Sequence, residues 1–163
     1  MNGTHLVLRA LHHGEERLGK ELLTVAERHG TDPEVRHVAI DLARWSHEHV
    51  QRLAETGRHR GLDLGDASKT SSAALLSALR KDAAEAVGHR SEPGLVLLRD
   101  LGDLHVAATQ NSLYWEMLAQ AAQAAGDDGL LALASACHPQ TLRQMRWTNT
   151  MIKTLSPQIL TSL

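Results

Sequence analysis

The sequence contains no phenylalanine, a single cysteine and no long apolar run, and the last two features exclude classes of protein. The lone Cys137 excludes an internal disulfide, and this cysteine usage fits a reducing compartment. No window reaches the run of about 18 apolar residues that a membrane-spanning helix needs. Residues 1–16 lack the basic start and apolar stretch of a signal peptide. We therefore expect a cytoplasmic protein that does not bind membranes.

A strongly basic face is also missing. The chain carries 17 Lys and Arg against 19 Asp and Glu, with a net charge of -2, and the two signs are mixed along it. Nucleic-acid binding requires a clustered basic surface, so we expect no nucleic-acid partner. With 163 residues, 42% of them hydrophobic and 22% charged, the chain is expected to form one globular domain over residues 1–163.

Apolar residues recur every three to four positions almost throughout, which predicts an all-α protein. Stop and start signals such as Gly30, Pro33 and Pro157 divide the pattern into helices at about residues 4–29, 33–57, 94–125 and 129–155. Pro139 is expected to bend or restart the last helix. Residues 58–93 form a long connection with one short helix, around residues 73–87. A long connection favours the ferritin-like crossover bundle, with the short-loop cytochrome-type bundle as the alternative.

Two polar residues interrupt the apolar stripes of the first two helices, namely Glu15 and His49. Counted from the turn near Thr31, both lie at nearly the same height, within roughly 3 Å at 1.5 Å per residue. A buried charge is costly unless it is paired or bound to a metal. The two side chains are therefore interpreted either as metal ligands or as a structural hydrogen-bonded pair, unless a small rotation of the first helix places Glu15 in solvent.

The second half of the chain contains a similar pair, Glu116 and His138, on either side of the turn at residues 126–127. His105, on nearly the same line of the third helix, is an alternative candidate to Glu116. The alternative interpretation of His138 is that it only occupies the entry of a helix, directly before Pro139. His12 and His29 are expected on the surface. The three tryptophans are expected to fill the core in place of phenylalanine.

The segments "HGEERL" (13–18), "SHEHVQRL" (46–53) and "GDDGLLALASACHPQTLRQMRW" (126–147) resemble the ferritin-like superfamily, in particular its small bacterial members with stress-associated roles. The resemblance implies a di-iron site with a Glu on the first and third helices and Glu-x-x-His on the second and fourth. Glu15 and His49 match two of these positions, but Ser46 stands where the second-helix Glu is implied. Ala108 and Asn111 lie at the corresponding depth of the third helix, and the fourth offers Gln140, Arg143 and Gln144. This broken motif argues against a ferroxidase or oxygenase.

Four hypotheses for function follow. The first is a ferritin-like bundle with a degenerate di-metal site and a non-catalytic binding or stress-associated role, acting as a homodimer or larger homo-oligomer. The second is a metal-binding protein with a rearranged site made by Glu15, His49, Glu116 and His138, with Fe or Zn as candidate ions. The third is a di-iron oxidoreductase or iron-storage protein. The fourth is an unrelated helical adaptor. No substrate is indicated by the sequence.

Overall fold

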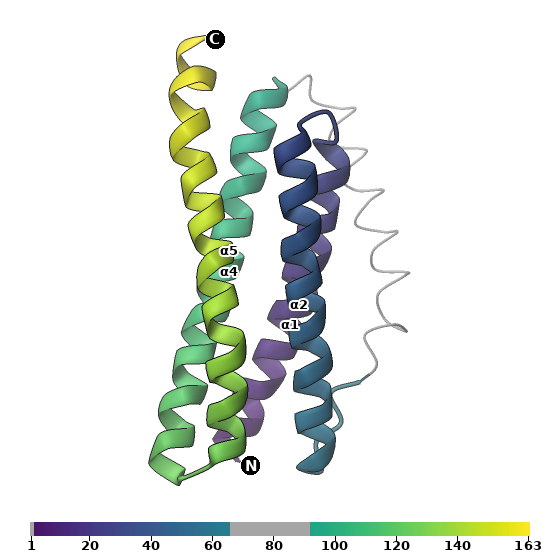
Figure 1. Cartoon of the computed structure of the whole chain (residues 1–163), viewed down its shortest axis with the longest axis vertical. Coiled ribbons are helices and arrows are strands. Elements are labelled where there is room, and N and C mark those ends of the chain that lie inside the picture. Colours follow the sequence, from purple (N-terminus) through teal and green to yellow (C-terminus); the bar gives the residue numbers. More distant parts are fainter. Residues whose placement is uncertain (1, 66–91) are drawn as a thin grey trace.

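A computed structural model describes residues 2–65 and 92–163, and these form four helices and no strand (Figure 1). The helices are α1 (Gly3–Arg28), α2 (Pro33–His59), α4 (Pro93–Ala125) and α5 (Asp128–Thr161). The predicted all-α, four-helix architecture is confirmed. The short helix expected near residues 73–87 lies outside the described residues.

Local sequence signals fix where the helices begin and end. Asp32 caps α2 by accepting a hydrogen bond from the Val35 amide at 3.1 Å, with Pro33 in the first turn. Asp127 caps α5 in the same way through the Leu130 amide at 3.1 Å. Gly126, between α4 and α5, has a left-handed backbone with φ of 65°, which glycine adopts without a steric penalty. Both hairpins therefore turn within a few residues.

Ion pairs between the hairpins show how they are oriented. Arg28, at the end of α1, contacts Asp100 near the start of α4 at 2.7 Å. Arg60, just after α2, contacts Asp127 just before α5 at 2.6 Å. Helix α1 is thus antiparallel to its neighbour α4, whereas α2 and α4 run in the same direction (Figure 1). The end of α2 and the start of α4 consequently lie at opposite ends of the bundle.

The core consists of two separate apolar clusters, one toward each end of the bundle. One contains Leu18, Leu22, Leu101 and Met151, and the other is built around Trp115 and its neighbours. Six of the ten buried polar side chains of the described residues lie between the two clusters, at intermediate positions along all four helices: Glu15, Ser46, His49, Asn111, Thr141 and Gln144. We call these six residues the polar layer.

Helix α5 is longer than the sequence analysis predicted, and this expectation needs correction. It continues through Pro139 and Pro157 to Thr161 instead of ending at residue 155. A proline inside a helix removes one backbone hydrogen bond to the carbonyl four residues earlier. Both prolines are exposed, as are Ser135 and Lys153 four residues before them, so water is able to satisfy the freed carbonyls.

Gly57 is expected to tolerate no side chain, because the chain folds back over it after α2. A Cβ there would lie 2.8 Å from the Leu62 carbonyl oxygen and 3.1 Å from Leu64. Alanine usually favours a helix over glycine by about 1 kcal/mol. Here Gly57→Ala should instead lower the free energy of unfolding by about 1–3 kcal/mol through overpacking. Urea unfolding of this variant measures the sign, and an increase in stability would contradict the expectation.

Candidate functional site

Glu15 and His49 meet in the middle of the bundle, as the residue count predicted. Glu15 is 0% exposed and His49 is 1% exposed, and His49 Nδ1 lies 3.1 Å from Glu15 Oε1. The two atoms are at ion-pair distance. They do not form a hydrogen bond, because Glu15 Oε1 is not aligned with the N–H direction of His49 Nδ1. A carboxylate and an imidazole thus face each other without water between them.

Two residues of the second hairpin complete the surroundings of Glu15. The indole Nε1–H of Trp115 donates to Glu15 Oε1 at 3.0 Å, and the hydroxyl of Thr141 donates to the same oxygen at 3.4 Å. The Trp115 ring also meets the His49 ring edge to face, with centroids 5.8 Å apart. From the sequence, Trp115 was expected only to fill the core. The available signal was its indole N–H, which needs an acceptor whenever it is buried.

Glutamine side chains of α5 bind the second-helix residues of the polar layer. His49 Nε2 is 2.7 Å from Gln140 Oε1. Gln144 Nε2 donates to the Ser46 hydroxyl at 2.9 Å and to the Leu42 carbonyl at 3.0 Å. Gln140, Gln144 and Ser46 stand where the sequence resemblance implied di-iron ligands, and they carry neutral amides and a hydroxyl. Arg143 is exposed and does not enter the layer.

Four buried polar atoms in the layer lack a hydrogen-bond partner among the described residues: Glu15 Oε2, His49 Nδ1, Asn111 Nδ2 and Gln144 Oε1. Gly14 lies against Asn111, because a Cβ on Gly14 would overlap the Asn111 amide oxygen. The amide of Asn111 therefore fills the space that a side chain at position 14 would occupy. Because these atoms have no partner among the described residues, the layer is a candidate site for binding a further polar group or ion.

The donor set does not fit a di-iron centre. Such a centre needs several carboxylates to balance two cations, whereas the layer offers one carboxylate and one imidazole. Among residues 2–65 and 92–163, no three His, Cys, Asp or Glu side chains gather around a common point. Cys137 does not supply a thiolate, because burial, the largest influence, raises the pKa of its thiol to about 12.

The other candidate residues lie apart from the layer. His138 Nδ1 is 3.8 Å from Glu116 Oε2, and its Nε2 is 2.9 Å from the Ser112 hydroxyl. Glu116 is 58% exposed, so this second pair belongs to the surface between α4 and α5. His105 bonds the Thr148 hydroxyl at 2.9 Å instead of substituting for Glu116. The two His/Glu pairs are brought together within each hairpin but not with each other.

Two histidines expected on the surface are buried, which corrects the sequence analysis. His12 is 6% exposed, its Nε2 has no hydrogen-bond partner among the described residues, and burial lowers its pKa. His29 is 9% exposed, and its Nε2 lies 2.8 Å from Asp100. His12 lies at the edge of the α1 stripe, and His29 is the residue that caps the end of α1 and contacts α4. Their burial depends on helix packing, which the α1 sequence does not encode.

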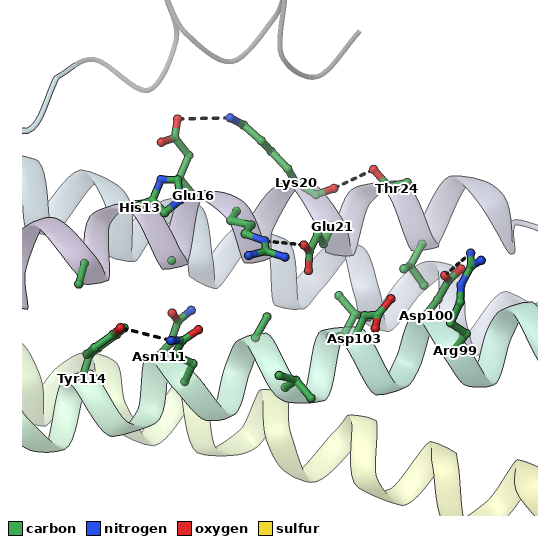
Figure 2. A pocket seen from close by; sticks show the side chains of 18 of the residues that line it. His13, Glu16, Lys20, Glu21, Thr24, Arg99, Asp100, Asp103, Asn111 and Tyr114 are labelled. Carbon is green, nitrogen blue, oxygen red and sulfur yellow. Dashed lines mark hydrogen bonds and ion pairs between the residues drawn. The ribbon is translucent and has the colours of Figure 1, made fainter. Parts of the chain in front are cut away.

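A groove runs along the surface between α1 and α4 (Figure 2). Its rim carries charges of both signs, and these largely pair with each other. Arg17 contacts Glu21 at 2.8 Å, and Lys20 reaches Glu16 at 3.5 Å. Because the charges offset one another, the groove is not a site for a strongly anionic or cationic ligand.

No described helix is long and apolar enough to cross a membrane. Comparisons of the chain with family models, with curated proteins and with solved structures give no match. The candidate function therefore depends on the chemistry of the polar layer.

Proposed function

We propose that this chain is a ferritin-like bundle with a degenerate di-metal site and a non-catalytic binding role. The bacterial, cytoplasmic and stress-associated character implied by the sequence resemblance belongs to the same proposal, as does action as a homo-oligomer. The helix directions support the ferritin-like topology, because α2 and α4 are parallel and the end of α2 lies at the opposite end of the bundle from the start of α4.

One observation carries the proposal. The positions that would complete a di-metal site hold Ser46, Gln140 and Gln144, and their side chains bond to His49, to one another and to backbone. The indole Nε1–H of Trp115 donates a hydrogen bond to Glu15 Oε1. A network of neutral donors around one carboxylate supports a non-catalytic role, because it lacks the several carboxylates that two metal ions need.

A single-ion site at Glu15 and His49 is the second candidate function. The buried Glu15 Oε2 atom favours it, because that oxygen has no hydrogen-bond partner among the described residues. Glu116 and His138 contribute nothing to such a site unless the hairpins rearrange, since Glu116 is on the surface.

Metal content separates these functions. Untagged protein is offered Fe(II), Zn(II) and Mn(II) in turn, desalted and analysed by mass spectrometry, and oxygen consumption with Fe(II) is recorded in parallel. We expect no stoichiometric retained metal and no oxygen uptake. About two irons per chain would contradict the proposal. One ion lost in His49→Ala but kept in His47→Ala, a control at an exposed histidine of the same helix, would establish the second candidate instead.

A further inference from the structure

The surface between α4 and α5 brings a serine, a histidine and a glutamate together. The two helices pack side by side (Figure 1), and His138 of α5 lies between two residues of α4. Its Nε2 is 2.9 Å from the Ser112 hydroxyl, and its Nδ1 is 3.8 Å from Glu116 Oε2. Ser112 and Glu116 are four residues apart, so both lie on the same side of α4. We call Ser112, His138 and Glu116 the α4–α5 triad.

The hydroxyl of Ser112 is directed differently from other hydroxyls on these helices. A serine or threonine inside a helix commonly donates to the backbone carbonyl four residues earlier, and Thr109 and Ser156 both do so. Ser112 instead directs its hydroxyl across to the ring of His138 on the other helix. Its oxygen is therefore placed beside a base that is able to take its proton.

Glu116 favours one protonation form of the His138 ring. Gln120 Nε2 donates to Glu116 Oε1 at 3.1 Å, while Glu116 Oε2 is the oxygen near His138 Nδ1. A carboxylate near Nδ1 favours the neutral ring with its proton on Nδ1, and Nε2 is then an acceptor for the Ser112 proton. A nucleophile bonded to a base that a third group orients is the arrangement of activated serines. Contacts of this kind are often longer than a hydrogen bond before a substrate binds, as the 3.8 Å contact is.

We propose that Ser112 is an acyl-acceptor site, at which the α4–α5 triad takes a short acyl group from an aryl ester. Ser112 Oγ attacks the carbonyl carbon of the ester, so that a new C–O bond forms and the bond to the phenolic oxygen breaks. The hydroxyl proton passes to His138 Nε2 and then to the departing phenolate, which balances the step without a further reactant. Leu142, 43% exposed and one turn after His138, offers an apolar surface to the aromatic ring of the donor. The polar layer contains neither Ser112 nor His138, so this inference does not depend on what that layer binds.

Acetylation by p-nitrophenyl acetate, located by peptide mapping with mass spectrometry, tests the proposal. We expect Ser112 to be acetylated at least about 100-fold faster than Ser156, since a positioned general base contributes a factor of this size. Ser156 is the matched control, because it is also a partly buried helical serine but donates to its own backbone. His138→Gln should remove the advantage of Ser112, whereas His47→Gln, at an exposed histidine of α2, should keep it. Equal acetylation of the two serines, or an unchanged rate in His138→Gln, would overturn the proposal.

The positioning role of Glu116 has a separate spectroscopic test. Nitrogen-15 NMR of the His138 ring, recorded at about pH 8 where an ordinary imidazole is neutral, reports which ring nitrogen carries the proton. We expect the proton on Nδ1 in the unmodified protein and a shift toward Nε2 in Glu116→Ala, with slower acetylation of Ser112 and unchanged helical circular dichroism. A proton on Nε2 in the unmodified protein would contradict the proposal, because His138 would then be unable to accept the Ser112 proton.

Discussion

Replacing Glu15 with leucine is expected to lower the free energy of unfolding by about 3–5 kcal/mol, the cost of removing one member of a buried ionisable pair. The substitution leaves His49 facing an apolar group and deprives the indole of Trp115 and the hydroxyl of Thr141 of their shared acceptor. Urea unfolding at pH 7, followed by far-ultraviolet circular dichroism, measures the change. At the adjacent Glu16, whose ion pair with Lys20 is partly exposed to solvent, the same substitution should cost less than about 1 kcal/mol.

A double-mutant cycle shows whether the loss comes from the pair itself. The variant Glu15→Leu/His49→Leu removes both members together, so neither is left facing an apolar residue. We expect it to lose about 1–3 kcal/mol less than the sum of the two single variants. Additive losses would mean that Glu15 and His49 contribute independently, and the structural pairing in the polar layer would then be wrong.

The second large effect is expected at Asp100, which joins the end of α1 to the start of α4. Its carboxylate is 5% exposed and accepts hydrogen bonds from Arg28 at 2.7 Å and from Arg99 at 3.1 Å, with His29 at 2.8 Å. Asp100→Asn should lower the free energy of unfolding by about 2–3 kcal/mol at pH 7, in line with hydrogen bonds to charged groups. Asp103→Asn, at an exposed position of the same helix, is the control and should cost less than about 0.5 kcal/mol.

The cost of Asp100→Asn should also depend on pH. Burial by itself would raise the pKa of Asp100, but the hydrogen bonds from His29, Arg28 and Arg99 and the Arg28 charge outweigh it and hold the pKa below the ordinary value of 3.8. A carboxyl group with a lowered folded-state pKa stabilises the protein above its unfolded-state pKa, and this stabilisation is lost as the pH falls through the folded-state value. The difference between the unmodified protein and Asp100→Asn should therefore be constant above about pH 5 and shrink below about pH 4. A difference that grows on acidification would contradict this assignment.

The sequence by itself determined the four long helices of the described residues and the height of Glu15 relative to His49. Both follow from short-range rules: the 3.6-residue period identifies helices, and the short turn near Thr31 fixes the stagger of α1 against α2. Counting residues from a tight turn measures height along a hairpin directly, and the 3.1 Å contact between His49 and Glu15 confirms it.

Only the tertiary structure decided which residues of the second hairpin meet that pair. The approach of Trp115, Thr141 and Gln140 to Glu15 and His49 depends on how α4 and α5 are rotated and shifted against α1 and α2. No short turn between the hairpins fixes this arrangement, since it results from packing two apolar clusters at once. The burial of His12 and His29 has the same origin, because a residue at the edge of a helical stripe or at a helix end is covered or exposed according to how the neighbouring helix packs.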